Sequence, residues 1–131
     1  LDSPLDLSQA LGALATVLDG RSLLRDHLTV AEKRLTLCLQ PSFDDARERI
    51  EAHRSAGAAR MYVGQYVEAM PYLREAETLA LKVHAIDQQA NALGMQAQCW
   101  LRLDRWDEVL STEDQWREIE KRYLRERVGE T

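Results

Sequence analysis

Apolar and small residues recur at steps of three and four along most of this 131-residue chain. This spacing keeps one face of an α-helix turned toward a packing partner. The clearest stretch runs from Ala56 to Val83, where small residues and Gly64 end one helix and a second follows at once. The apolar face of that second helix comprises Tyr66, Ala69, Leu73, Ala76, Ala80 and Val83. The stretch therefore predicts a helical hairpin with a close-packed seam.

The same periodicity predicts six helices that pair as three hairpins. Short connections between helices favour antiparallel packing of neighbours. We expect a single domain over residues 1–131, with hairpins over about 4–39, 43–83 and 86–127. The division between the second and third hairpins, near His84, carries neither Gly nor Pro.

The helix ends and packed faces can be assigned from residue type. The first helix is expected to begin at a Ser3 cap and to pack through a leucine stripe. That stripe comprises Leu7, Leu11, Leu14 and Leu18. Ser42 is the expected start of the third helix, since Asp45 follows it at capping-box spacing. Asp104 is expected to cap the sixth helix, and His53 is expected to be a hydrogen-bonded packing residue of the third.

The composition supports an all-α fold and excludes several functional classes. Apolar residues make up 45% and charged residues 30%, while three Pro and six Gly are too few for a many-turned β-fold. A net charge of −5 argues against a nucleic-acid-binding surface. No apolar run approaches the roughly 20 residues that span a bilayer, and the N-terminus lacks a signal-peptide pattern. The chain does not begin with Met, which is typical of a fragment of a longer protein.

The sequence shows no chemistry-bearing motif. Cys38 and Cys99 lie in apolar helical patterns without metal-ligand spacing, and the three histidines fall on different predicted helices. Two buried free thiols in a reducing cytoplasm are the favoured interpretation, with a disulfide or reactive thiol as the alternative. No phosphate-binding, nucleophile-elbow or zinc-protease motif occurs. We expect a cytoplasmic protein that is not an enzyme and that uses no cofactor and no metal.

Comparison of the chain with itself shows a long repeat, with a period of about 40 residues. Tyr66 aligns with Trp106, and Met61 aligns with Leu101. A looser copy at the start of the chain, around Leu11 and Gly12, requires a different offset, of 44 to 45 along the sequence. Most of the chain is therefore predicted to consist of copies of one helical hairpin.

The central copy resembles the tetratricopeptide repeat (TPR) family. It has small residues midway along its first helix, a Gly-x-aromatic turn, and Ala positions flanking a large apolar residue on its second helix. The matching residues are Gly57, Gly64, Tyr66, Ala69, Leu73 and Ala76. The resemblance implies a TPR-like superhelix of three antiparallel hairpins. The repeat is degenerate, because His53 and Arg60 stand at or near the usual Trp and Tyr positions and the period exceeds the common repeat length of about 34 residues.

The resemblance also implies a binding surface. In this family, partners dock on the concave face formed by the first helices of successive hairpins. Carried over to this chain, the candidates are Glu51, Arg54, Ala58 and Tyr62 on the third helix and Asn91, Gln98 and Arg102 on the fifth. The arginines are expected to bind a carboxylate, the amides a peptide backbone, and the tyrosine to stack. The alternative is that all are ordinary solvated side chains.

The last copy departs from the pattern of the central one. Moving the apolar face of residues 66–83 forward by one period gives Trp106, Val109, Glu113, Trp116, Glu120 and Tyr123. Two apolar positions have become Glu, and an Ala position has become Trp116. We expect this helix to end the array as a polar cap. A competing interpretation is a homodimer patch formed by Trp116, Ile119 and Tyr123.

These observations predict a non-catalytic scaffold that binds a protein or peptide and neither nucleic acid nor membrane. The alternative is a sensor or regulatory segment of a larger bacterial signalling or transcription regulator, since the long repeat period is similar to that of repeats in such proteins. A plain helical bundle is the structural alternative. It requires the fifth helix to pack outside a stack of hairpins.

Overall fold

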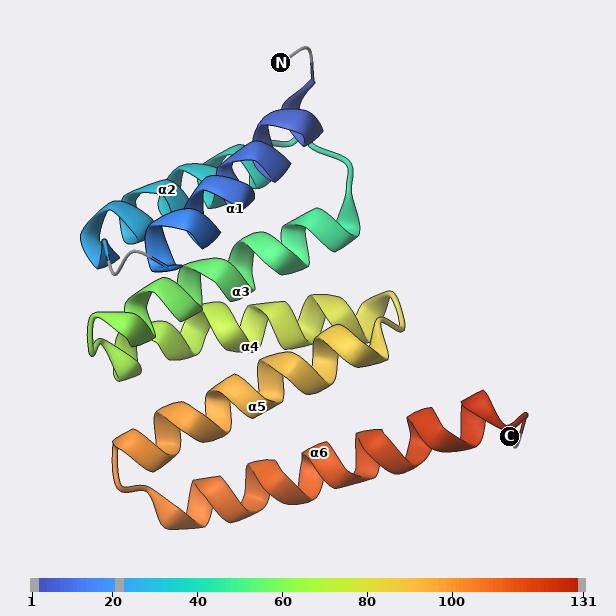
Figure 1. The fold of residues 1–131 in the computed structure, drawn as a ribbon. Helices are drawn as coiled ribbons and strands as arrows, with labels where there is room; N and C mark the ends of the chain where they lie inside the picture. Colours follow the sequence, from blue (N-terminus) through green and yellow to red (C-terminus); the bar gives the residue numbers. More distant parts are fainter. Residues whose placement is uncertain (1–2, 21–22, 130–131) are drawn as a thin grey trace.

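A computed structural model describes residues 3–20 and 23–129 of the chain. Within these ranges the protein forms six helices and no strand (Figure 1). The helices are α1 (Pro4–Gly20), α2 (Leu24–Cys38), α3 (Ala46–Tyr62), α4 (Tyr66–Lys82), α5 (Ile86–Arg102) and α6 (Trp106–Arg127). The all-α prediction and the six predicted helices are confirmed. No helix of the described ranges is long and apolar enough to cross a membrane.

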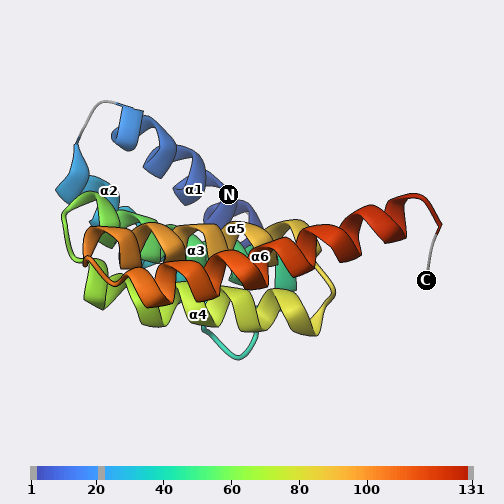
Figure 2. The same cartoon turned by 90° about the horizontal axis from the view of Figure 1, so that it is seen from below.

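The helices stack in chain order as antiparallel neighbours, from α1 and α2 at one end to α6 at the other (Figure 1). Beyond consecutive pairs, α1 contacts α3 and α3 contacts α5. Among the described residues α2, α4 and α6 do not contact one another. The first helices of the hairpins therefore form the inner layer, and the second helices lie splayed on the outside. Because α5 packs between α4 and α6, a plain bundle is excluded. The last turns of α6 project beyond the stack (Figure 2).

The helix starts give the register of the repeat. Helices α5 and α6 begin at Ile86 and Trp106, the positions that the predicted period aligns with Ala46 and Tyr66, where α3 and α4 begin. The predicted period is therefore confirmed for the second and third hairpins.

The predicted register of the first repeat is wrong. An offset of 44 to 45 would align the start of α3 with residue 1 or 2, whereas α1 begins at Pro4. The first repeat is still slightly longer than the second, because two differences in length act in opposite directions and the lengthening one is larger. Helix α2 is shorter than α4, at 15 against 17 residues, but the linker 39–45 is longer than the turn 83–85 by more than this difference.

Three turns share one geometry at the ends of α3, α4 and α5. Their middle residues, Gly64, His84 and Asp104, have φ values of 82°, 56° and 59°. The next residue in each donates its N–H to the carbonyl five positions earlier, at 2.8 Å, 2.9 Å and 2.9 Å. A left-handed residue after a helix end is the usual way to satisfy its last carbonyls. The turn at His84 therefore ends α4 without glycine.

Two of the predicted caps are wrong. Asp104 occupies the left-handed turn and accepts a hydrogen bond from Trp106 Nε1 at 2.7 Å, while α6 begins after Arg105 without a side-chain cap. Asp45, rather than Ser42, caps α3 by accepting from the Glu48 N–H at 2.9 Å. In the linker before α3, Phe43 is buried in a cluster with residues of α2 and α3. The Ser3 cap is confirmed.

The core consists of small residues and a few large ones between successive helices. Ile50, Leu73 and Leu93 are the largest fully buried side chains, and alanines fill much of the space between them. His53 is buried, with Nδ1 2.8 Å from the Arg49 carbonyl, as expected for a packing residue. The described cysteines are both free and buried, as predicted.

The predicted packing face of α1 is wrong. Ser8 and Ala15 are buried against the neighbouring helices, whereas Leu7 and Leu14 are 41% and 46% exposed. The inward face consists mainly of small residues, and Ser8 on this face donates a hydrogen bond of 2.7 Å to Glu48 Oε1 on α3. The leucine stripe is consequently left on the surface.

Candidate partner-binding groove

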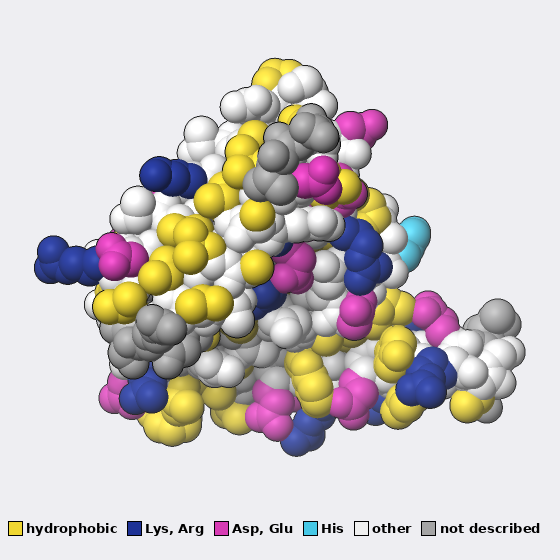
Figure 3. Space-filling view, turned by 45° about the horizontal axis from the view of Figure 1, so that its top comes forward, with side chains coloured by type: hydrophobic (Ala, Val, Ile, Leu, Met, Phe, Trp, Pro, Cys, Tyr) yellow, Lys and Arg dark blue, Asp and Glu magenta, His cyan; other side chains and the backbone are white. Residues whose placement is uncertain are grey.

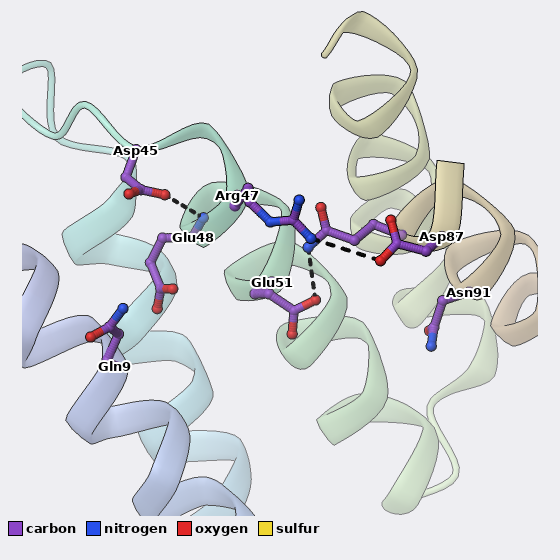
Figure 4. Close-up of a pocket in the computed structure, with 8 residues that line it drawn as sticks. Gln9, Asp45, Arg47, Glu48, Glu51, Asp87 and Asn91 are labelled. Atoms are coloured by element: carbon purple, nitrogen blue, oxygen red, sulfur yellow. Dashed lines mark hydrogen bonds and ion pairs between the residues drawn. The ribbon is translucent and has the colours of Figure 1, made fainter. Parts of the chain in front are cut away.

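A groove of about 580 Å³ crosses the inner layer of the stack from α1 over α3 to α5 (Figure 4). Its lining is polar, and half of the lining residues are acidic. The lining residues are Gln9, Asp45, Arg47, Glu48, Glu51, Asp87, Gln88 and Asn91.

Three of these residues occupy the same position of successive repeats. Gln9, Glu51 and Asn91 each lie five positions after the first residue of their helix, which is Pro4 in α1, Ala46 in α3 and Ile86 in α5. The groove is therefore lined by one equivalent face of α1, α3 and α5, as the concave surface of a helical array should be.

Arg47 extends from α3 toward Asp87 on α5, across the mouth of the groove (Figure 4). The shortest N–O distance is 3.7 Å, and both side chains are more than two-thirds exposed. Exposed pairs of this kind contribute about 0–1 kcal/mol. Because this ion pair is weak, Arg47 and Asp87 can each release the other and bind a charged group of a ligand instead.

Glu51 forms the centre of the groove and is held by two neighbours. Arg54 donates hydrogen bonds of 2.8 Å and 3.3 Å to its carboxylate, and Gln88 Nε2 donates one of 3.2 Å. Burial acts to raise the pKa of Glu51, but these hydrogen bonds and the charge of Arg54 outweigh it and hold the pKa below its ordinary value. Glu51 is therefore an ionised acceptor.

The floor of the groove is a buried polar junction. Glu48 Oε1 accepts from Arg34 Nη2 at 2.5 Å, from Arg34 Nε at 3.1 Å and from Ser8 at 2.7 Å. The Arg34 and Glu48 side chains are each only 10% exposed. The Arg34 guanidinium also lies against Gly12, where an added Cβ would come within 2.6 Å of Nη1. This junction ties α1, α2 and α3 together and fixes the position of Glu48.

The arrangement favours recognition by hydrogen bonds and charge. The Gln9 and Asn91 amides are exposed and can both donate and accept. No cluster of His, Cys, Asp or Glu suited to a metal ion occurs in the described ranges. The groove offers ionised acceptors, amides and one loosely held guanidinium.

The structure brings together only part of the predicted binding face. Glu51 and Asn91 line the groove, and Arg54 borders it through its bonds to Glu51. Gln98 and Arg102 are exposed toward the C-terminal end of α5 and do not line this groove. Ala58 is buried, at 5% exposure, and lies too deep to touch a partner.

Tyr62 lies apart from the groove, at the end of α3. Its side chain is 48% exposed, and its ring centroid is 5.6 Å from that of His27 on α2. The tilted arrangement of the two rings, at 32°, leaves the tyrosine partly covered on one side.

Sequence reasoning missed several lining residues. Gln9, Arg47, Asp87 and Gln88 were not among the candidates, although the first follows from the repeat once the register of the first hairpin is known. The acidic residues at the start of α3 and α5 also had a simpler explanation, since they favour a helix N-terminus. The tertiary structure, which places the starts of α3 and α5 next to each other, shows that these acidic residues line one groove.

The three residues of the predicted homodimer patch do not share one surface. Trp116 and Tyr123 are 37% and 40% exposed, but Ile119 is 5% exposed and lies within the contact between α6 and α5. Trp116 lines an apolar cavity of about 240 Å³ with Leu93, Gly94 and other residues of both helices.

The comparisons with known proteins identify the fold. No family model matches the sequence, and no curated protein matches it. The crystal structure of the TPR domain of Arabidopsis FLU is similar, with a TM-score of 0.75 over 87% of this chain and 94% of that chain, at 18% sequence identity. Likeness at this level of identity concerns the fold alone. The chain therefore has a TPR-like fold, in which three helical hairpins follow one another in a single stack.

Proposed function

We propose that this protein is a non-catalytic scaffold that binds a peptide segment of a partner protein in the groove across α1, α3 and α5. The observation that carries this proposal is the alignment of Gln9, Glu51 and Asn91 along one face of three successive repeats. Equivalent side chains at regular intervals suit a ligand that is itself extended and periodic, such as a peptide backbone.

The charge of the groove indicates which peptides fit. Four carboxylates line it against one guanidinium, and Arg54 is already bonded to Glu51. Arg54 is therefore poorly placed to bind a partner carboxylate, the role expected for it from sequence. A basic side chain of the peptide can instead pair with Asp87, while Gln9 and Asn91 bond its backbone.

A cytoplasmic location accords with the same proposal. Both described cysteines are free, and burial raises the pKa of each thiol, to about 11 for Cys99. Thiols of this kind are inert packing residues and persist in reducing compartments.

Selection from a random peptide library, followed by anisotropy titration of the enriched peptides, tests the proposal. We expect peptides rich in Lys or Arg. Replacing Gln9, Asp87 and Asn91 with Ala should weaken binding about tenfold or more, because the removed groups supply the polar contacts.

Gln98→Ala/Arg102→Ala is the matched control, since both residues are exposed on α5 outside the groove. The proposal fails if no peptide is enriched, or if the groove variant binds the enriched peptides as tightly as the wild type. Loss of binding in the control variant alone would move the site toward the C-terminal end of α5.

A further inference from the structure

Helix α1 carries an exposed apolar stripe along its length. Leu7, Leu14 and Val17 are 41%, 46% and 53% exposed, and Leu11 and Leu18 are half-buried. Figure 3 shows hydrophobic side chains gathered in a diagonal band over the part of the surface that α1 forms. Contiguous apolar surface of this kind on a helix marks an interaction site more often than scattered exposed leucines do.

The repeat register shows what kind of element this stripe is built to meet. Counted from the start of each helix, Leu7, Leu14 and Leu18 of α1 correspond to Arg49, Ala56 and Arg60 of α3. All three contact α2: Arg49 Nε donates to the Cys38 carbonyl at 3.0 Å, Ala56 packs with Leu35 and Cys38, and Arg60 pairs with Glu32.

The next repeat uses the same positions in the same way. Gln96 and Trp100 of α5 correspond to Ala56 and Arg60 of α3. Gln96 Nε2 donates to Glu77 Oε1 on α4 at 3.0 Å, and Trp100 packs on a cluster that includes Leu73 of α4. In both inner repeats this face receives a preceding helix, so the stripe of α1 has the position of a helix-docking surface.

A second copy of this chain is a poor occupant. Two α1 helices would bring like charges together, because the only charged residues in the sequence of this helix are acidic. Helix α6 is no better, since Arg117 and Glu120 stand at its positions equivalent to Leu35 and Cys38 of α2.

We propose that the leucine stripe of α1 (Leu7, Leu11, Leu14, Leu18 and Val17) docks an amphipathic helix of a partner protein that has Lys or Arg beside its apolar face. The leucines take the apolar face of that helix. Its basic residues meet Asp6, which stands at the α1 position equivalent to Glu48 of α3, where Glu48 pairs with Arg34 of the preceding helix α2. This surface is separate from the peptide groove proposed above.

Two synthetic helical peptides test the proposal. Both carry one leucine stripe at steps of three and four, flanked by Lys in the first and by Glu in the second, with a fluorophore for anisotropy titration. The lysine peptide should bind the wild-type chain about tenfold more tightly than the glutamate peptide. Equal binding of the two peptides would overturn the assignment of a basic partner.

The variant Leu7→Ser/Leu14→Ser should bind the lysine peptide about tenfold more weakly, because two apolar contacts are lost. Both residues are exposed, so folding is retained, which circular dichroism verifies. Leu110→Ser is the matched control, since Leu110 is 59% exposed on α6, which does not contact α1 in the described residues. Unchanged binding by the double variant would overturn the docking surface.

Sedimentation of the wild-type chain and the double variant decides about a second copy. A concentration-dependent dimer that the double variant abolishes would overturn the partner assignment in favour of self-association. The triple groove variant of Gln9, Asp87 and Asn91 should bind the lysine peptide like the wild type. Its failure to do so would mean that the peptide reports on the groove instead of on α1.

Discussion

Leu73 of α4 occupies the space that Gly57 of α3 leaves open. A Cβ built at Gly57 would lie 2.6 Å from Leu73 Cδ2, and Leu73 is fully buried. We predict that Gly57→Ala destabilises the protein by about 1–3 kcal/mol, because a well-packed leucine has no room to move away. Urea unfolding followed by circular dichroism measures the change.

Gly94 of α5 gives the matched comparison. It is also helical, but nothing lies within 4 Å of a Cβ built on it. Gly94→Ala should therefore stabilise the protein by about 0.5–1 kcal/mol through helix propensity alone. Equal effects of the two substitutions would show that the close approach of α3 and α4 has no energetic weight.

The turn residues predict a second pair of opposite effects. His84 has a φ of 56°, a conformation in which a side chain is unfavourable. His84→Gly should raise the free energy of unfolding by about 1 kcal/mol, and Gly64→Ala should lower it by about 1–2 kcal/mol. Asp104→Gly should gain less than His84→Gly, because it also removes the hydrogen bond from Trp106. Thermal unfolding of the three variants ranks them directly.

The buried junction predicts the largest effect of any single charge removal described above. Glu48→Ala leaves the Arg34 guanidinium, 10% exposed, without its carboxylate partner. We expect a loss of about 3–5 kcal/mol, the usual cost of an uncompensated buried charge. Glu113→Ala is the control, because it removes the partner of Arg117 from an exposed pair on α6 and should change stability by less than about 1 kcal/mol.

The sequence was sufficient to predict the hairpins because the contact between their two helices requires small and large apolar residues at fixed helical spacing. Ala69, Leu73 and Ala76 alternate small and large at helical spacing, and all three are fully buried. The period of the last two hairpins is regular because α3, α4 and α5 are equal in length and are joined by equal turns. The first repeat was misplaced because the shorter α2 and the longer linker 39–45 change its offset, and neither is visible in a hydrophobic pattern.

The face of α1 and the groove required the tertiary structure. A leucine stripe normally predicts the buried side of a helix, yet Ser8 lies inside because Arg34 and Glu48 come from distant segments to bind it. The groove likewise depends on α3 and α5 starting side by side, which places Glu51 and Asn91 together. Residue spacing within one helix predicts neither the buried face of α1 nor the neighbouring starts of α3 and α5.

The low pKa of Glu51 predicts a pH dependence of stability. Because the folded-state pKa lies below the unfolded value, the ionised carboxylate stabilises the fold above about pH 4.5, and this contribution is lost as the pH falls through the folded-state pKa. Glu51→Gln should therefore flatten the decline in the urea midpoint on acidification. A decline as steep as that of the wild type would assign the acid sensitivity to other carboxylates.

Helices α1 and α6 together predict how copies of this chain can be made to polymerise. Arg117 and Glu120 of α6 stand where α2 has Leu35 and Cys38, which pack against α3. Replacing them by Arg117→Leu/Glu120→Ala should give α6 an apolar face that fits the leucine stripe of α1 in the next copy. Such head-to-tail contacts are heterologous and do not close on themselves, so the weight-average mass in sedimentation equilibrium should rise with concentration. Adding Leu7→Ser/Leu14→Ser should restore the wild-type mass. If the α6 double variant sediments like the wild type, the charges at these two positions are not what keeps α6 from docking on α1 of another copy.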